Sequence, residues 1–507
     1  MSERRRFAAA VLAALASASC AAVGPDYVAP STVVPATWDA STPEIAGAVA
    51  ATPTRGDATM AEPAHGEATM AAPANADLAS WWRVFADPVL DDLVARALAA
   101  NNDLRAAAAR VRAARATRSG AEAALLPDLN ASADFERRRS SGATLAVGQG
   151  AEFNRYTSGF DASWEIDIFG GLRRGREQAE AALDAADADL RDTLVTLLAE
   201  VARNYVDLRS LAERVDIAER NARSQADTVA LARWRYEAGL IGDLNVQQAE
   251  YNLAETLARI PTLQASHAAA SNRIAVLLGA FPGSLDELLA GRRQVPLPPR
   301  EVAIGVPADL LRRRPDLEAA ERRLAAATAA VGVATADLYP RLTLNGAISV
   351  AAADFADLDA ANARGFSIGP SLQWNVFDAG RVRSVIEERS AAADEALAAY
   401  DTAVLTAFEE ASNALVALDR EQVRRDRLAE GRASAFAAEE LARLQYENGL
   451  VDFQQLLDAQ RALLGFEETL ASSSATVTTN VIALYKALGG GWEKVRCDGD
   501  GCAATGD

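Results

Sequence analysis

Histidine, cysteine and aromatic residues are scarce in this chain of 507 residues. It has two histidines, three cysteines, 6% aromatic residues and a formal net charge of −19. Because the histidines and cysteines form no cluster with the spacing of metal ligands, we expect no bound metal. With no nucleophile motif either, we expect no catalytic residues, no cofactor and no enzyme activity. The acidic balance argues against nucleic acid as a partner, since binding to phosphates depends on Lys and Arg.

A long apolar run is also missing after the first twenty residues. No stretch of 18 or more apolar residues follows, so we expect no transmembrane helix in the mature chain. Any part of the mature chain that spans a membrane is therefore expected to do so with β-strands.

The N-terminus has the composition of an export signal. Arg4–Arg6 is basic, Phe7–Ala16 is apolar, and small residues follow as far as Cys20. This order predicts a signal peptide over 1–19. The sequence Ser17-Ala18-Ser19-Cys20 is similar to a lipoprotein cleavage box, which would leave a lipid on Cys20. A plain signal-peptidase site after Ala16-Ser17-Ala18 is the alternative.

Most of the remaining chain is a tandem duplication. Asp103-Leu104 corresponds to Asp316-Leu317, and Tyr236-Glu237-Ala238-Gly239-Leu240 corresponds to Tyr446-Glu447-Asn448-Gly449-Leu450. Such self-similarity indicates one structural unit present twice.

The first repeat begins with a proline-free helical segment, Val89–Leu126, which Pro127 ends. The second repeats this segment from Ala308 to Tyr339, before Pro340. Alternating apolar and polar residues then predict β-strands with one face toward lipid and one toward a lumen. The expected strands are 128–137, 156–168, 341–351 and 365–377. Amphipathic hairpins packed on a soluble core are the alternative. Trp164 and Trp374 suit either an interfacial or a buried position.

A long amphipathic helix follows the strands in each repeat, over 173–238 and 381–448. Apolar residues recur at spacings of three and four, which is typical of a coiled-coil seam, and about 66 residues span roughly 100 Å. The chain then turns and returns through a shorter helix, kinked at Pro261 in the first repeat. We expect two shorter helices, stacked end to end, beside each long one.

Four strands are too few to close a membrane barrel, and an open edge is not tolerated in lipid. Several copies must therefore share one barrel, and three copies supply twelve strands.

Four motifs then point to a family. They are Gly24-Pro25-Asp26-Tyr27, Leu310-Leu311-Arg312-Arg313-Arg314-Pro315-Asp316-Leu317-Glu318-Ala319-Ala320-Glu321, Leu456-Leu457-Asp458-Ala459-Gln460 and Ala487-Leu488-Gly489-Gly490-Gly491-Trp492. With these residues the chain resembles the TolC-like outer-membrane efflux channels, of the OprM and NodT type, over residues 20 to 492.

The resemblance implies a mainly α fold with a transmembrane β part. Four strands per protomer would form a shared 12-stranded β-barrel in a homotrimer, continued by an α-barrel of long helices in the periplasm. It implies a passive exit duct in the outer membrane, anchored by lipid, for drugs or other small molecules. An inner-membrane pump and a periplasmic adaptor would be the partners. The alternatives are the outer-membrane duct of a type I protein secretion system and a periplasmic coiled-coil structural protein.

The resemblance also implies two functional regions. Gly239, Leu240, Gly449 and Leu450 match the helix tips that contact the adaptor, and a purely structural turn is the other interpretation. Asp458 matches a carboxylate that narrows the periplasmic aperture, and it is otherwise a solvated helix residue or a cap. The further aperture positions are Gln454 and Gln455 beside it, and Leu244 and Asn245 in the first repeat.

Two remaining features lie near the edges of these repeats. Cys497 and Cys502 either close a small disulfide or belong to an unstructured tail. Arg312–Arg314 is expected to be a solvated face or a salt-bridge cluster. The expected divisions of the chain are a signal peptide (1–19), a lipidated segment (20–39), a disordered Ala- and Pro-rich linker (40–76), a first efflux repeat (77–282), a connecting segment (283–306), a second efflux repeat (307–492) and a C-terminal tail (493–507).

Overall fold

The computed structural model describes residues 22–30, 78–139, 152–291, 294–300 and 313–493, and the backbone of 495–498 and 501–504. Two compact units divide the chain. The first unit is Met1–Ser31, Arg110–Asp187 and Ala319–Asp401, and the second unit is Thr32–Ala109, Ala188–Glu318 and Thr402–Asp507. Each sequence repeat contributes to both units, so the units cut across the duplication. Cys20 and the expected linker 40–76 lie outside the described residues.

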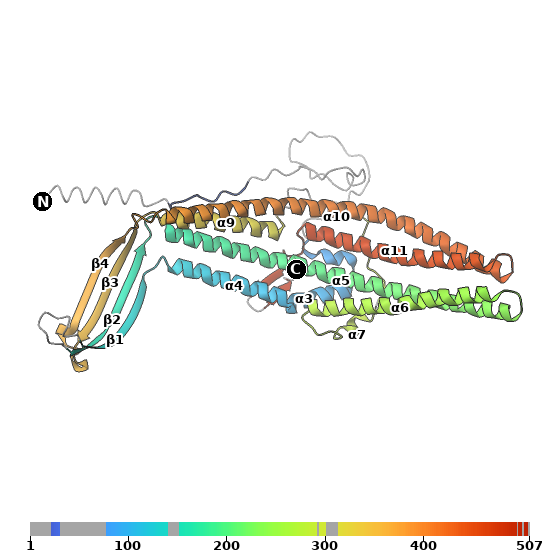
Figure 1. The fold of residues 1–507 in the computed structure, drawn as a ribbon, viewed down its shortest axis with the longest axis horizontal. Helices are drawn as coiled ribbons and strands as arrows, with labels where there is room; N and C mark the ends of the chain where they lie inside the picture. The colour runs from blue at the N-terminus through green and yellow to red at the C-terminus, as the bar shows by residue number, and fades with distance from the viewer. Residues whose placement is uncertain are drawn as a thin grey trace, which may run out of the picture. The chain divides into compact units, whose positions relative to one another are not determined.

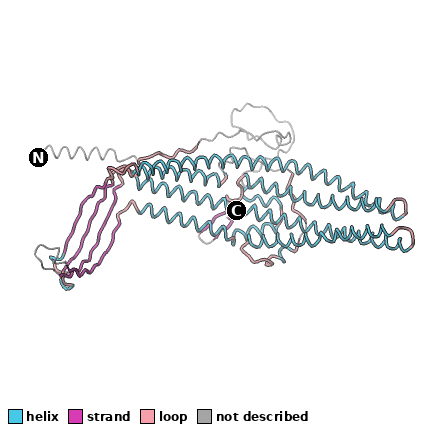
Figure 2. The backbone as a smooth tube through the Cα atoms, in the orientation of Figure 1, coloured by secondary structure: helices cyan, strands magenta, loops and turns pink. Residues whose placement is uncertain are grey.

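The first unit contains a four-stranded antiparallel sheet in the order β1-β2-β3-β4 (Figures 1 and 2). Its strands are β1 (Asp128–Arg139), β2 (Glu152–Ile166), β3 (Arg341–Ala352) and β4 (Arg364–Gln373). β2 ends two residues before the predicted 168, and Asp167 lies in the loop before α5 (Gly171–Glu237), where its side chain bonds to the first turn of that helix. Its Oδ2 accepts a hydrogen bond from the backbone N–H of Arg173 at 2.9 Å. β4 likewise ends at Gln373 rather than 377.

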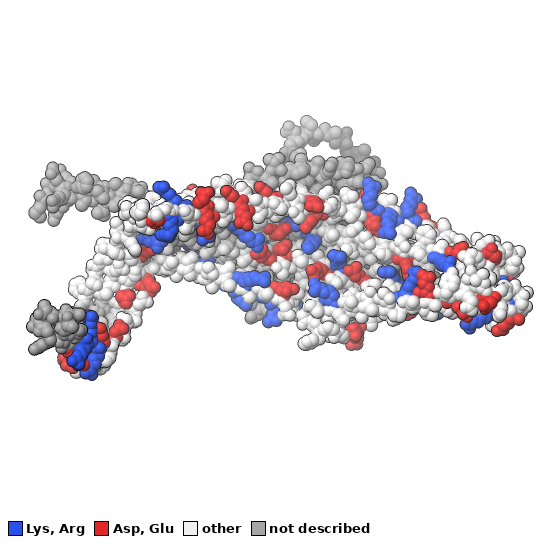
Figure 3. Space-filling view, viewed as in Figure 1, with Lys and Arg blue, Asp and Glu red and all other residues white. Residues whose placement is uncertain are grey.

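The register of the sheet separates apolar from polar side chains. Ala131, Phe160, Ile348 and Phe366 form one row across all four strands, and the last three are large and well exposed. On the opposite face, Ser163 Oγ donates to Asn345 Oδ1 at 3.2 Å, and Asn345 Nδ2 donates to Ser371 Oγ at 3.1 Å. Most atoms over the strands are uncharged in Figure 3. The sheet thus has an exposed apolar face and a hydrogen-bonded polar face.

Trp164 and Trp374 connect the sheet to the ends of the helical segments that precede it. Trp164 Nε1 donates to Leu125 O at 2.9 Å, and Trp374 Nε1 donates to Leu338 O at 3.1 Å. Each acceptor lies just before the proline that ends the helical segment. Both rings are partly exposed, so they fit the interfacial interpretation better than the buried one.

The long helices are α5 (Gly171–Glu237) and α10 (Arg381–Glu447), with 67 residues each. Each is followed by a returning helix of 35 residues, α6 (Asp243–Leu277) or α11 (Phe453–Ala487), and α6 continues through Pro261. Leu194, Leu197, Val201, Tyr205 and Leu208, five of the apolar residues whose spacing predicted a seam, are all buried along α5. The other elements are η1 (Leu78–Phe85), α7 (Asp286–Leu289), η2 (Phe355–Asp357), η3 (Ala361–Ala363), β5 (Val495–Asp498) and β6 (Gly501–Ala504).

The prediction of one helix over Val89–Leu126 is wrong. The segment forms α3 (Pro88–Ala100) and α4 (Asn102–Ala123), separated by Asn101 with φ −63° and ψ 131°. Asn101 Oδ1 accepts from the backbone N–H of Leu104 at 2.9 Å, so it caps α4. Its Nδ2 donates to Leu277 O at 2.8 Å in the last turn of α6. The break is therefore the point at which α6 ends against the α3–α4 junction.

The second repeat makes the same joint with a different side chain. Arg314 stands at the position equivalent to Asn101 and precedes α9 (Pro315–Ala336). Its Nη1 donates to Ala487 O at 3.1 Å, at the end of α11, and the guanidinium pairs with Asp316 and Glu410, each at 2.7 Å. The solvated-face interpretation is wrong for this buried residue, and the salt-bridge cluster is what forms there.

We predict that Asn101→Ala lowers the free energy of unfolding by about 1–3 kcal/mol, because Leu277 O and the start of α4 lose a buried partner. Thermal and denaturant unfolding of the purified protein measure this. The exposed neighbour Asn102→Ala is the control and should change stability little. Equal stability of the two variants would show that Asn101 does not stabilise the contact between α6 and the α3–α4 junction.

Candidate functional site

Two matching turns connect the long helices to the returning ones in the second unit. Gly239 and Gly449 both have φ +72°, a left-handed conformation that favours glycine. The backbone N–H of Leu240 donates to Arg235 O, and that of Leu450 donates to Gln445 O, both at 2.8 Å. These are six-to-one bonds of the Schellman type, which satisfy the carbonyls at the end of a helix. The glycines are therefore required by the turn itself.

Apolar side chains are exposed at the apex of both turns. Leu240 is 72% exposed and Leu450 is 75% exposed, at equivalent positions of the two repeats. Trp234 and Leu244 are exposed nearby on the first hairpin. Solvent-exposed leucines at both apices are not needed for the turns, whose hydrogen bonds are made by the backbone. They leave apolar side chains exposed to solvent at both turns.

Behind the turns, helices of both repeats share one small core. Its buried residues are Val229, Ala232, Val246, Ala249, Tyr446, Phe453, Leu456 and Leu457. Arg235 Nη2 donates to Glu447 O at 2.8 Å, and its guanidinium lies 4.3 Å from the centre of the Tyr446 ring. This core and the Arg235 contacts hold the two hairpins to each other near their ends.

The predicted aperture residues lie in the first turns of the returning helices. Asp458 is exposed on α11, where its Oδ1 accepts from Gln454 Nε2 at 2.9 Å. Gln455 contributes its backbone N–H to Asp452 Oδ1 at 3.0 Å, so Asp452, rather than Asp458, is the N-cap of α11. Leu244 and Asn245 lie at the start of α6, with Leu244 exposed. The structure thus brings Gln454 to Asp458 and places Leu244 and Asn245 on the other hairpin.

Arg461 is a residue of this region that sequence reasoning missed. Its guanidinium donates to Asn252 Oδ1 at 2.7 and 3.1 Å and to the Tyr251 hydroxyl at 2.6 Å, both on α6. It also pairs with Asp458 at 3.4 Å. One side chain therefore links α6 to α11 and to the acidic position. Its two partners on α6 are more than 200 residues away in sequence, so no local pattern indicates them.

A buried contact ties α11 to α5 as well. Gln460 Nε2 donates to Thr228 Oγ1 at 2.9 Å, and both residues are buried. Among the described residues, Gln460 Oε1 has no hydrogen-bond partner. The end of the bundle is thus held by polar contacts as well as by apolar packing, and polar contacts are lost sharply when their geometry changes.

Within the described ranges, no group of three or more His, Cys, Asp or Glu residues is placed to hold a metal ion. No helix there is long and apolar enough to cross a membrane. For the predicted disulfide, the backbone register of β5 and β6 places Cys497 opposite Cys502.

A sheet with an exposed apolar face, joined to long helical hairpins with apolar tips, defines the class of outer-membrane export channels. Residues 93–280 and 306–490 match the family model described as outer membrane efflux protein. The chain belongs to this family, and it is a mainly α, outer-membrane efflux component. The predicted family, fold class, location and general function are confirmed.

Individual relatives agree with this assignment. Nodulation protein T of Rhizobium leguminosarum bv. trifolii is 34% identical over 420 residues, covering 82% of this chain and 89% of that protein. The pyoverdine export outer membrane protein OpmQ of Pseudomonas putida is 35% identical over 426 residues, covering 82% and 88%. Among solved structures, the outer-membrane channel OprN has a TM-score of 0.82 at 38% identity, covering 93% of this chain and 99% of that one.

We predict that Arg461→Ala loosens the ends of the hairpins, because α6 loses three hydrogen bonds from α11. Hydrogen exchange should rise in the peptides of residues 243–252 and 453–461 and stay unchanged in those of the sheet. Arg427→Ala, an exposed arginine that pairs within α10, is the control. Unchanged hydrogen exchange at residues 243–252 in Arg461→Ala would show that Arg461 does not stabilise the contact between α6 and α11.

Proposed function

We propose that three copies of this chain form a passive exit duct for drugs or other small molecules. An inner-membrane pump, acting through a periplasmic adaptor, would load the duct and supply the energy, so the chain itself performs no catalysis. The observation that carries the proposal is the sheet. Within the described chain, β1 pairs only with β2 and β4 only with β3, and the apolar face is exposed.

Both features fit completion of the sheet by identical neighbours. A strand edge in lipid leaves backbone N–H and C=O groups unpaired, and each such group costs several kcal/mol. Pairing β4 of one copy with β1 of the next satisfies both edges, and three copies give twelve strands. The polar face, with Ser163, Asn345 and Ser371, would then line the lumen.

The hairpin ends would serve as the adaptor-contacting tips and the periplasmic aperture. Leu240 and Leu450 present apolar surface for an adaptor, on turns set by Gly239 and Gly449. Asp458 is exposed on α11, so three copies of it around an axis would form an acidic ring that favours cations. Gln454 accompanies it within each protomer, and Arg461 holds it near α6.

Two covalent features complete the proposal. Cys20 would carry the lipid that anchors the chain in the outer membrane. Cys497 and Cys502 would form a disulfide in the oxidising periplasm, and the pairing of β5 with β6 supports this because it sets the two Cα atoms opposite each other.

The membrane-facing side of the sheet can be tested with a matched pair on β4. Ile368 is exposed on the apolar face, and its neighbour Ser367 lies on the polar face. Ile368→Arg should impair insertion into outer-membrane vesicles, at a cost of up to about 2–4 kcal/mol near the bilayer midplane. Ser367→Arg should insert normally. Equal insertion of both variants, or a monomer in native mass spectrometry of the wild-type protein, would refute the proposed duct.

The aperture is tested by single-channel recording in planar bilayers. Asp458→Ala should raise the conductance and lower the cation selectivity, because it removes the acidic ring and one partner of Arg461. Asp243→Ala, which removes an acid from the first turn of α6 instead, is the control. If Asp458→Ala leaves conductance and selectivity unchanged, Asp458 is not part of the aperture.

A further inference from the structure

Residues 22–30 form an extended strap along the first unit. The backbone N–H of Val23 donates to Phe169 O at 3.0 Å, in the loop between β2 and α5. Gly170, in the same loop, is so close that a Cβ there would lie 2.6 Å from the Ala22 Cβ. The start of the strap is thus held where the sheet meets the long helix.

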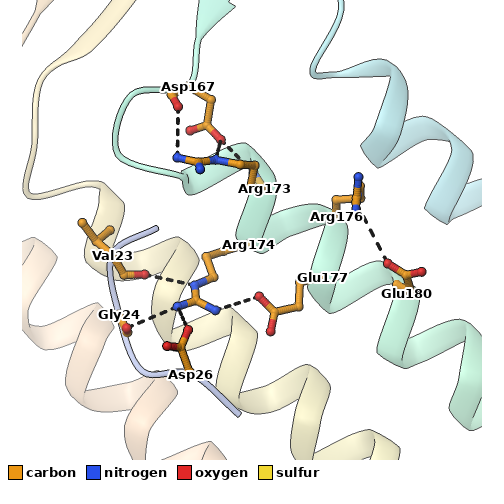
Figure 4. A network of polar contacts seen from close by, with 9 residues as sticks. All are labelled: Val23, Gly24, Asp26, Asp167, Arg173, Arg174, Arg176, Glu177 and Glu180. Carbon is orange, nitrogen blue, oxygen red and sulfur yellow. Dashed lines mark hydrogen bonds and ion pairs between the residues drawn. The ribbon is translucent and has the colours of Figure 1, made fainter. Parts of the chain in front are cut away.

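Arg174 of α5 makes the main contacts to this strap (Figure 4). Its side chain is only 5% exposed. Nε donates to Val23 O at 3.1 Å, and Nη2 donates to Gly24 O at 3.3 Å and to Asp26 Oδ1 at 2.5 Å. Nη1 donates to Glu177 on its own helix at 2.7 Å. Burial lowers the pKa of Arg174, but the hydrogen bonds to Asp26 and Glu177 outweigh it, and the net pKa is raised.

The place where the strap meets α9 and Arg174, here called the seat of the strap, has no room for larger residues. Gly24 has φ +88°, and a Cβ on it would lie 2.4 Å from the Cα of Gly332 in α9. A Cβ on Gly332 would in turn lie 2.8 Å from Cγ of Arg174. The two glycines therefore let the strap, α9 and the arginine side chain meet in one place.

A second contact fixes the strap at another point of α9, nearer the start of that helix. The Tyr27 hydroxyl donates to Glu321 Oε1 at 2.9 Å, and the Arg322 guanidinium lies 5.6 Å from the centre of the Tyr27 ring. The strap thus connects α5 of the first repeat to α9 of the second. Three residues of the motif Gly24-Pro25-Asp26-Tyr27 therefore contact Arg174, Gly332 or Glu321.

We propose that Arg174 is a positioning residue that clamps the mature N-terminus beside the β2–α5 loop, and so sets where the lipid anchor enters the membrane. Two peptide units reach at most about 7 Å, so a lipid on Cys20 stays close to the clamped Ala22. The acyl chains then enter the bilayer next to the membrane strands rather than at the end of a free tether. This proposal rests on the proposed function for the lipid and for the position of the membrane.

The test compares Arg174→Gln with Arg176→Gln in the full-length protein. Arg176 lies on the same helix, is exposed and pairs only weakly with Glu180, at 4.0 Å. Hydrogen exchange in the peptide covering residues 22–28 should rise at least about tenfold in Arg174→Gln, because the strap loses its charged donor. Chymotrypsin should then cut after Tyr27 and release the N-terminal peptide with its lipid. Arg176→Gln should behave as wild type in both assays.

Two further variants separate positioning from general stability. Arg174→Lys keeps the charge and should restore part of the protection at 22–28. Gly332→Val removes no charge but fills the seat, so it should release the strap as Arg174→Gln does. If Arg174→Gln fails to fold, Gly332→Val gives the answer alone: raised exchange at 22–28 supports the clamp, and unchanged exchange overturns it.

The proposed clamp is refuted if the Arg174→Gln variant is folded and trimeric in the outer membrane and keeps the wild-type protection from hydrogen exchange at residues 22–28. It is also wrong if Arg176→Gln loses that protection equally. Membrane fractionation and native mass spectrometry of the wild type report on the proposed duct independently. A wild-type chain absent from the outer membrane would refute the proposed function, whatever the strap does.

Discussion

The two outer edges of the four-stranded sheet, which no other described strand pairs, constrain how this protein can assemble. An antiparallel sheet of this size has two edge strands, and an apolar, exposed face such as that carrying Phe160, Ile348 and Phe366 belongs in lipid. Backbone groups cannot remain unpaired there. One chain therefore cannot satisfy its own backbone, and identical neighbours are the economical solution. The duplicated chain suits this, because each repeat supplies one hairpin to the sheet.

The duplication also shows how one geometric problem is solved by different chemistry. In both repeats the returning helix ends against the start of another helix, and its last carbonyls need a donor. Asn101 supplies an amide to Leu277 in the first repeat, and Arg314 supplies a guanidinium to Ala487 in the second. The arginine needs Asp316 and Glu410 to balance its buried charge, whereas the asparagine needs no counterion. The tryptophans are different in this respect, since Trp164 and Trp374 make the same bond in both repeats.

The hairpin ends join structure to the proposed function. The two turns are made by the same local backbone hydrogen bonds. The contacts between the hairpins, in contrast, join residues that are distant in sequence. Arg461 reaches from the second repeat to Tyr251 and Asn252 in the first, and Gln460 reaches Thr228. A small apolar core and a few polar contacts thus hold the two hairpins together at this end of the bundle.

The sequence by itself determined the four strands of the sheet, the long helices and the turns that follow them. Alternation of period two located the strands, spacings of three and four located α5 and α10, and Gly239 and Gly449 located the turns, because these signals are local consequences of backbone geometry. Only the tertiary structure decided the break at Asn101, the burial of Arg314, the link made by Arg461 and the clamp made by Arg174. Each of these depends on which polar group from a distant segment faces the side chain. A sequence pattern records the period of a helix or strand, but not the partner that packing brings to it.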